Sequence, residues 1–254
     1  MSVDPRAASG FATAADAYHR GRPSYPAQVI TVVVDVLGLG GTSTVLDLAA
    51  GTGQLARLMR PHVGQVIAVE PAAAMRDTLA AEMPDVAALD GTAEAIPLDD
   101  QSVDAVVVGE AFHWFRTAEA AREIARVLTE QGGLALLWNV PTWTVEDTPW
   151  LDAFRRIVAD YKRAAGGYPA GGSSWRERLD ETSLFAAITH VQATHTQHLS
   201  CDDFVAQVAS WSWIANLPAA ERLAVLTRVR ELMREHPEIS IPYRTDLYWT
   251  RRTT

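Results

Sequence analysis

One short stretch places the strongest constraint on the fold: "VLDLAAGTGQLARLM", which covers residues 45–59. It begins with a short apolar run that ends at two closely spaced glycines, as buried parallel strands do. Helical spacing then starts at Gln54 and stops before Pro61. A strand joined to a helix by a glycine turn indicates a parallel α/β unit, because parallel strands need a crossover connection that is usually a helix.

The same alternation continues to Asn139. A helix is expected over Pro26–Leu37, although its β-branched run is also compatible with a strand. Further strands are expected at residues 65–70, 86–90, 102–110 and 133–139, with helices at 72–83 and 118–128. Alternating strands and helices predict parallel strands covered by helices on both faces. We therefore predict the α/β class, with a doubly wound, mostly parallel seven-stranded sheet and an inserted helical cap.

After Asn139 the rhythm changes to an aromatic-rich helix and then to four glycines within residues 166–172. A long insertion of this kind is typical of a lid or cap. Another strand, two helices and a closing strand follow. We expect four segments: an N-terminal lid segment with the first helix (1–43), a ligand-binding core (44–140), an inserted cap with a Gly-rich loop (141–187), and C-terminal strands and helices that complete the sheet and the substrate side (188–254).

Charge and cysteine content exclude several classes of protein. The formal net charge of -9 disfavours a nucleic-acid partner, since that affinity comes mainly from Lys and Arg. The single cysteine excludes an intramolecular disulfide and fits a reducing compartment. No apolar run approaches the roughly 18 residues that span a bilayer, and the first ten residues contain no apolar signal segment. We expect a cytoplasmic monomer or homodimer without a membrane partner.

The glycine turn is compatible with more than one ligand. Gly51, Gly53 and Ala56 satisfy the dinucleotide pattern G-x-G-x-x-A, and Glu70 follows at the end of the next strand. A phosphate-binding loop is disfavoured because no Gly-Lys-Ser/Thr follows. Asp47, at the mouth of the first strand, would repel a pyrophosphate but favour an ammonium group. An NAD(P)-dependent oxidoreductase therefore stays open as an alternative, disfavoured by Asp47 and by the absence of a Tyr-x-x-x-Lys pair.

A ligand with an amino-acid part and a ribose fits these residues better. Glycines allow the backbone to approach a ligand closely, and a carboxylate at Glu70 can accept two hydrogen bonds from a ribose diol. S-adenosylmethionine combines an amino acid, a sulfonium cation and an adenosine ribose. It is the cofactor that we expect.

Four motifs carry a family resemblance: "VLDLAAGTG", "VIAVEPAAAM", "GTAEAIPLDDQSVDAVVVGEAFHWF" and "ARVLTEQGGLALLWN". In this order they resemble the successive motifs of class I S-adenosylmethionine-dependent methyltransferases. Within that superfamily the chain resembles the type 11 small-molecule group, including trans-aconitate methyltransferase-like proteins, whose fourth strand also ends in a His-Trp pair. The stretches "AADAYHRGRPSYP" and "IPYRTDLYW" are similar to that subgroup too. The resemblance implies a Rossmann-like methyltransferase fold.

The resemblance also implies a residue for each part of the methyl donor. Asp47, Gly51 and Gly53 would hold the methionine portion, Glu70 the ribose, and Met75 one face of the adenine. The alternative for Asp47 is a cap on the following helix, and for Met75 it is core packing.

A triplet, Thr92, Ala93 and Glu94, stands where the family commonly has Asp-Ala-Glu beside the adenine. Thr92 departs from that pattern, so the usual carboxylate contact to the adenine amine is replaced or lost. A backbone contact from Ala93 is one replacement.

The segment "GEAFHWF" follows the strand at residues 102–110 and is expected beside the methyl donor, because open α/β sheets bind ligands at the carboxyl ends of their strands. Glu110 is a candidate for donor binding and for catalysis. His113 is a candidate general base, a substrate contact or a packing residue, and Trp114 is a candidate substrate contact. A carboxylate acceptor needs no base, whereas a carbon or hydroxyl acceptor usually needs one.

Further substrate contacts are expected from both ends of the chain. Tyr18, Arg22 and Tyr25 lie in an N-terminal segment that helps to close the pocket in the resembling family, and the alternative is an exposed basic arm. Arg244 would form a charge-assisted contact to an acidic substrate, or else a surface ion pair. The histidines at 190, 195 and 198 do not share one helical face, so no metal is expected.

The sequence thus predicts an S-adenosylmethionine-dependent methyltransferase that acts on a small organic acceptor, with a carboxylate or keto acid as the candidate class. A methyltransferase of RNA or protein is disfavoured by the acidic charge balance. A non-catalytic S-adenosylmethionine-binding protein stays open as an alternative, because the sequence motifs identify the donor site far better than they identify the acceptor site.

Overall fold

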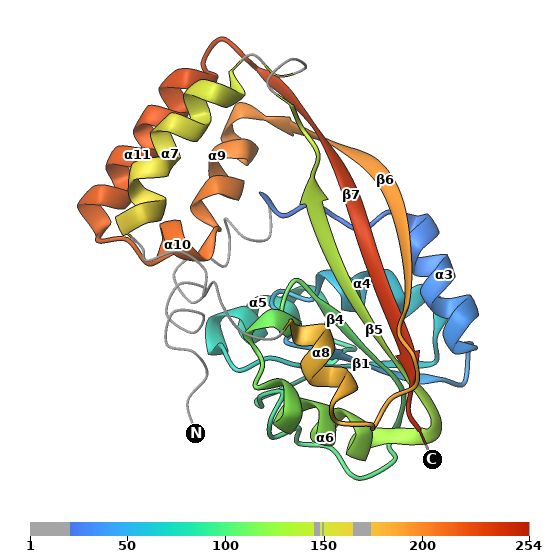
Figure 1. The fold of residues 1–254 in the computed structure, drawn as a ribbon. Coiled ribbons are helices and arrows are strands. Elements are labelled where there is room, and N and C mark those ends of the chain that lie inside the picture. Colours follow the sequence, from blue (N-terminus) through green and yellow to red (C-terminus); the bar gives the residue numbers. More distant parts are fainter. Residues whose placement is uncertain (1–20, 145–147, 149, 165–173, 254) are drawn as a thin grey trace. The chain divides into compact units, whose positions relative to one another are not determined.

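The computed structural model describes residues 21–144, 148, 150–164 and 174–253 (Figure 1). Its elements begin with α3 (Ala27–Leu37), β1 (Thr44–Leu48), α4 (Gln54–Met59), η1 (Arg60–His62), β2 (Gln65–Val69), α5 (Ala73–Glu82), β3 (Ala87–Leu89), β4 (Val103–Gly109), η2 (Phe112–Trp114) and α6 (Thr117–Val127). The chain continues with β5 (Leu128–Pro141), α7 (Leu151–Ala164), α8 (Trp175–Asp180), β6 (Thr189–Ser200), α9 (Cys201–Ala209), α10 (Ser212–Ala215), α11 (Ala219–Met233) and β7 (Glu238–Arg251).

The strands form one seven-stranded sheet in the order β3-β2-β1-β4-β5-β7-β6. The pairs β3–β2, β2–β1, β1–β4 and β4–β5 are all parallel. Thr245 bonds to Asn139 and Arg252 to Gly132, so β7 runs antiparallel to β5. The predicted doubly wound, mostly parallel seven-stranded sheet is confirmed.

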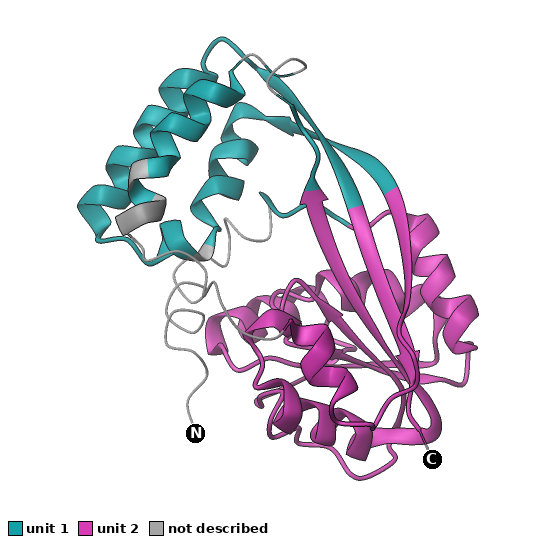
Figure 2. Ribbon diagram, viewed as in Figure 1, with its two compact units in different colours: residues 1–24, 141–171, 194–244 teal, residues 25–140, 172–193, 245–254 magenta. Residues whose placement is uncertain are grey.

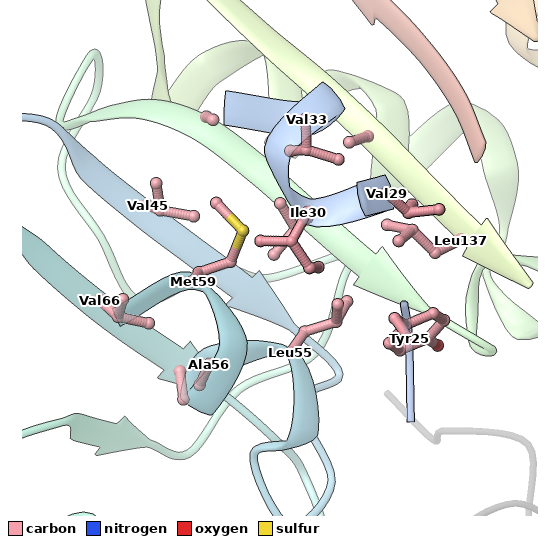
Figure 3. Close-up of a cluster of buried hydrophobic side chains, with 14 of the residues drawn as sticks. Tyr25, Val29, Ile30, Val33, Val45, Leu55, Ala56, Met59, Val66 and Leu137 are labelled. Carbon is pink, nitrogen blue, oxygen red and sulfur yellow. The ribbon is translucent and has the colours of Figure 1, made fainter. Parts of the chain in front are cut away.

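The helix α3 settles an ambiguity of its sequence, since its β-branched run was also compatible with a strand. Gly38 ends the helix in the left-handed conformation (φ 66°), which a glycine adopts without steric cost. The buried residues Val29, Ile30 and Val33 recur at helical spacing and pack against the sheet (Figure 3). Burial of this apolar stripe therefore outweighs the strand preference of the individual valines.

Alternate residues along the strands pack into two different core clusters. The first contains Val45, Val107 and Leu137 together with residues of α3, α4 and α5, and the second contains Leu46, Val106 and Leu136 together with residues of η2 and α6. Because successive side chains of a strand point to opposite faces, both faces of the sheet are covered by helices. The strands can therefore be apolar throughout, as their sequences are.

The chain forms two compact units (Figure 2). Unit 1 comprises residues 1–24, 141–171 and 194–244, and unit 2 comprises residues 25–140, 172–193 and 245–254. The stretch 141–187, expected to be a single inserted cap, is divided: α7 belongs to unit 1, and α8 belongs to unit 2, where Leu179 packs in the second core cluster. The expected Gly-rich loop lies outside the described residues.

Unit 1 has its own apolar core, which we call the third core cluster, and which is built by α7, α9, α10, α11 and the unit 1 parts of the strands. Edge-on aromatic contacts dominate it, for example between Trp150 and Phe204 at 5.4 Å and between Phe154 and Trp211 at 5.8 Å. Such pairs stabilise a core beyond the burial of their area. No helix within the described part of the chain is long and apolar enough to cross a membrane.

Candidate functional site

Two neighbouring strands of unit 2 end in unusual backbone conformations. Ala49, after β1, and Glu110, after β4, are not glycines, yet both have positive φ angles, of 58° and 57°. The strands β1 and β4 are adjacent, and the chain leaves β1 toward β2 and β3 before it returns to β4. This reversal is the topological switch point, where open α/β sheets bind their ligands. Left-handed residues other than glycine are uncommon and cluster at functional sites.

Asp47 lies at the carboxyl end of β1 and is 1% exposed. The backbone N–H of Ala56, in the first turn of α4, donates to Asp47 Oδ2 at 2.8 Å. The helix-capping alternative for Asp47 is therefore present in the structure. The pKa of Asp47 is raised to about 7. Burial is the largest cause and the neighbouring Glu70 also raises the pKa, whereas the hydrogen bond from Ala56 lowers it. A cation beside this carboxyl group would favour its ionised form.

Glu70 lies directly after β2 and is 8% exposed. Its Oε2 accepts the N–H of Gly51 at 3.0 Å, and its Oε1 accepts the N–H of Ala72 at 2.9 Å. Burial raises the pKa of Glu70, while these two hydrogen bonds and Arg76 lower it. A carboxylate oxygen has two lone pairs, so both oxygens of Glu70 keep acceptor capacity. Glu70 thus connects the glycine turn to the start of α5 and can still accept hydrogen bonds from a diol.

The two glycines of the turn are explained by their backbone. Gly51 and Gly53 have φ angles of 58° and 83°, in the left-handed region. A Cβ on Gly53 would lie 2.3 Å from Met83 Cε and 2.9 Å from Leu79 Cγ, so α4 and α5 approach too closely for a side chain at this position. Gly53 is therefore required by conformation and by helix packing, independently of any ligand.

The residues expected beside an adenine lie in two segments. Met75, in the first turn of α5, is 1% exposed. Thr92 forms an isolated antiparallel bridge with Ala95, and Ala93 packs in the second core cluster. Glu94 Oε1 accepts the N–H of Arg116 at 2.9 Å, which ties this segment to the start of α6.

Glu110 is held by a network that the sequence did not reveal. The N–H of Asn139 donates to Glu110 Oε1 at 2.5 Å, and Thr245 Oγ1 donates to Asn139 Oδ1 at 2.5 Å. Asn139 and Thr245 are brought together by the pairing of β5 with β7. The available signal was Asn139, a polar residue at the end of the apolar run "LALLW".

His113 lies on η2, four residues beyond the end of β4. Its Nδ1 is 3.3 Å from Nε1 of Trp138, a residue near the carboxyl end of β5. The His113 and Trp114 rings are tilted, with centroids 5.0 Å apart. Trp138 was not identified from the sequence as a site residue.

The remaining candidate substrate contacts fall in different parts of the molecule. Tyr25 is 5% exposed and packs in the first core cluster (Figure 3). Its hydroxyl lies beside Gly109, at the end of β4. Arg22 and Arg244 belong to unit 1, where Arg22 Nη2 donates to the carbonyl of Ser210 at 3.4 Å. Tyr18 lies outside the described residues.

Histidines do not form a metal site in the described part of the chain, where no group of three His, Cys, Asp or Glu residues is placed to hold an ion. His190 Nε2 lies 2.9 Å from Asp246 Oδ1, and His198 Nδ1 lies 2.9 Å from Ser240 Oγ. These two rings have other partners.

Comparison with known proteins agrees with this geometry. A family model for a methyltransferase domain matches residues 46–136, which contain the glycine turn, Glu70 and His113. An uncharacterized methyltransferase of Mycobacterium tuberculosis is 38% identical over 230 residues, covering 91% of this chain and 88% of the relative. The chain belongs to the class I S-adenosylmethionine-dependent methyltransferases. Its cofactor is S-adenosylmethionine, which excludes the nicotinamide alternative for the glycine turn.

Solved structures show the same fold at low identity. A putative type II methyltransferase from Anaeromyxobacter dehalogenans has a TM-score of 0.61 and 19% identity, covering 91% of this methyltransferase and 97% of that chain. A geranyl diphosphate methyltransferase solved in complex with S-adenosylmethionine has a TM-score of 0.52 and 16% identity, covering 89% of this chain and 85% of that one.

The described residues also fit the cofactor on their own chemistry. Two buried carboxyl groups, Asp47 and Glu70, flank a turn of left-handed residues at the switch point. Buried carboxylates oppose phosphates and suit an ammonium group and a diol, which S-adenosylmethionine carries. The chemistry of this turn therefore suits a ligand that has no phosphate group.

Proposed function

We propose that the enzyme transfers a methyl group to a small organic acceptor, a carboxylate or keto acid, as a trans-aconitate methyltransferase-like protein would. The observation that carries this proposal is the position of η2. It brings His113 and Trp114 next to the left-handed Glu110 at the switch point, where Asp47 also lies at the carboxyl end of β1. The formal net charge of -9 disfavours a polyanionic acceptor such as RNA.

The donor residues have distinct roles in this proposal. Asp47 faces the ammonium group, Gly51 and Gly53 shape the turn around the methionine part, and Glu70 accepts from the ribose diol. Met75 lies against the adenine, which is bordered by the segment of Thr92, Ala93 and Glu94. When bound, S-adenosylmethionine supplies an electrophilic methyl group, so alignment of the acceptor provides much of the acceleration.

The acceptor residues come from the rest of the chain. Glu110 borders the donor and, through Asn139, fixes the end of β5. His113 and Trp114 contact the acceptor, and Tyr25 contributes its hydroxyl at the end of β4. Arg22 and Arg244 supply positive charge for an acidic acceptor, with Tyr18 as a further contact. We also propose that the enzyme works in the cytoplasm as a monomer or homodimer.

Two experiments test this function in sequence. Calorimetric titration with S-adenosylhomocysteine, with NADH as the comparison, tests the donor site, and only S-adenosylhomocysteine is expected to bind. Transfer from labelled S-adenosylmethionine to a panel of small carboxylates, keto acids, phenols and bulk RNA then tests the acceptor class. Label in the acids supports the proposal. Label only in phenols or RNA contradicts it, and binding of S-adenosylhomocysteine without transfer to any of these acceptors also contradicts the proposed acceptor class.

A further inference from the structure

His113 and Trp138 form a contact whose direction is chemically determined. The indole nitrogen of Trp138 always carries a hydrogen and has no lone pair to offer, so it is only a donor. In the 3.3 Å contact the Trp138 Nε1–H therefore donates, and His113 Nδ1 accepts. An imidazole nitrogen that accepts a hydrogen bond carries no proton itself. The proton of a neutral His113 must then reside on the other ring nitrogen, Nε2.

The direction of the Trp138 N–H is held by neighbouring rings of unit 2. Trp175 stacks on Trp138 with centroids 5.2 Å apart and planes inclined by 28°, and Tyr248 meets the same ring edge-on at 5.8 Å. Tyr248 is itself stacked on His190 at 4.1 Å, with the planes inclined by 5°. A donor that is supported in this way is preorganised, because its partner does not have to order it during the reaction.

His190 is fixed in turn by Asp246. The two side chains are 2.9 Å apart, and Gln192 Nε2 donates to the same carboxylate oxygen at 2.7 Å. Asp246 is only 5% exposed, whereas its partners His190 and Gln192 are exposed residues of the edge strand β6. A continuous set of side chains from β5, β6, β7 and α8 thus determines where the Trp138 N–H points.

We propose that Trp138 is a positioning residue that holds His113 in the Nε2–H tautomer, so that His113 donates a hydrogen bond to the acceptor instead of taking a proton from it. A general base needs a lone pair, but in this tautomer the Nδ1 lone pair is engaged by Trp138 and Nε2 is protonated. This inference rests on the proposed function and narrows its acceptor. An acceptor that ionises without help, such as a carboxylate, matches His113, whereas a phenol or a carbon acid does not.

The chemistry balances without a proton transfer. A carboxylate oxygen forms the new bond to the methyl carbon, and the carbon–sulfur bond breaks with its electron pair going to sulfur. The Nε2–H of His113 orients the carboxylate through its second oxygen. Orientation of this kind supplies rate through alignment alone.

The tautomer is measurable without substrate. In 15N-histidine-labelled protein at pH 8, the bare and the protonated ring nitrogens have well-separated 15N chemical shifts, and the His113→Gln spectrum identifies the His113 signals. We expect a bare Nδ1 and a protonated Nε2 in the wild type, and a mixture of tautomers in Trp138→Phe. Trp249→Phe, which removes an indole that packs against the first core cluster, is the matched control and should leave the His113 signals unchanged. A proton on Nδ1 in the wild type would overturn the inference.

Activity separates a donor from a base. Gln carries an N–H donor near the position of Nε2 but cannot take up a proton at neutral pH, and Leu has neither property. With a carboxylate acceptor, His113→Gln should stay within about 10-fold of the wild-type kcat/KM, and His113→Leu should lose about 100-fold, as expected for a lost hydrogen bond to a charged group. Equal losses in both variants would contradict the donor role.

Failure of the proposed function and failure of this inference give different results. If S-adenosylhomocysteine binds to all variants but no small acceptor is methylated by the wild type, the proposed function fails while the tautomer result still stands or falls by the 15N spectra. If carboxylates are methylated and His113→Gln is as inactive as His113→Leu, the proposed function survives and the inference fails.

Discussion

Two regions of the molecule are stabilised by different interactions. One is the edge of the sheet formed by the carboxyl ends of the strands of unit 2, where Asp47 and Glu70 lie, and the other is the aromatic core of unit 1. At the edge, two carboxyl groups are buried and accept hydrogen bonds from backbone N–H groups 2 to 19 residues away, such as those of Ala72 and Gly51 for Glu70. In unit 1, polar contacts join distant parts of the chain, as between Arg22 and Ser210, 188 residues apart. This difference explains why short sequence motifs predict the residues of the donor site but not those of the acceptor site.

Burial has a different consequence in each region. At the edge it acts on charge, since it raises the pKa of both Asp47 and Glu70. In unit 1 it acts on aromatic rings, whose contacts tolerate exchange among apolar residues of similar size. We therefore expect substitutions of the two acids at the edge to affect cofactor binding strongly, and conservative exchanges among the rings of unit 1 to leave it unchanged.

The largest effect is expected from Glu70→Ala. It removes the acceptor for the ribose diol and leaves the N–H groups of Gly51 and Ala72 without their carboxylate. Affinity for S-adenosylhomocysteine should fall about 100-fold, as for the loss of charged hydrogen bonds, while circular dichroism reports a folded protein. Glu119→Gln on α6 is the matched control and should bind as the wild type does. Unchanged binding in Glu70→Ala would refute the assignment of the ribose.

Gly53→Ala tests whether the turn depends on conformation. The substitution places a Cβ at a φ of 83° and within 2.3 Å of Met83 Cε, so it should lower the free energy of unfolding by about 2 kcal/mol. Gly40→Ala is the control, because no atom lies within 4 Å of its added Cβ and its φ is ordinary. Urea unfolding of the two variants makes the comparison, and equal stabilities would mean that the turn relaxes freely.

Asp47→Asn tests the buried charge of this carboxyl group. Its affinity for S-adenosylhomocysteine at pH 8 should be about 10-fold lower than that of the wild type. Burial raises the pKa of Asp47 from its ordinary value of 3.8 to about 7, so folding takes up a proton between these values. The free energy of unfolding should therefore fall as the pH rises from 4 through 7, and Asp47→Asn should remove this part of the fall. Urea unfolding across this range measures it. A parallel decline in both proteins would contradict the shift.

The same carboxyl group predicts a pH dependence of binding. The ammonium group of the ligand favours ionised Asp47, so binding at pH 6 must release a proton that is already absent at pH 8. Wild-type affinity for S-adenosylhomocysteine should therefore rise severalfold between these pH values, and Asp47→Asn should show little of this rise. Calorimetry in buffers of different ionisation enthalpy reports the released proton directly.

The smallest effect is expected in unit 1. Arg244→Gln should raise the KM for an acidic acceptor by roughly 5-fold, as for a partly exposed charge-assisted contact, and leave S-adenosylhomocysteine binding unchanged. Arg228→Gln on the exposed side of α11 is the matched control. A loss of cofactor affinity in Arg244→Gln would remove the distinction between the two regions.

Local periodicity was sufficient for most of the fold and for the donor residues. The strand, turn and helix around Asp47 follow from residues close in sequence, and Glu70 follows from its place at the next strand end. The division of residues 141–187 between two units was missed, because nothing local to α8 reveals that it packs on α6 and the sheet.

The site residues Trp138, Asn139 and Thr245 were missed for a related reason. Each acts through a partner on another strand or loop: Trp138 bonds to His113, and Thr245 bonds to Asn139 only because β7 lies beside β5. Spacing along the chain contains no information about such a pair when the partners are 25 or 106 residues apart. Packing of the sheet brings them into contact.

The amino-acid sequence by itself determined the order of strands and helices, the left-handed glycine turn and the two acids that flank it, since each depends on neighbours along the chain. Only the tertiary structure decided how the acids are buried and which nitrogen of His113 carries the proton. Both depend on desolvation and on the direction of hydrogen bonds, and these properties arise when segments distant in sequence pack together.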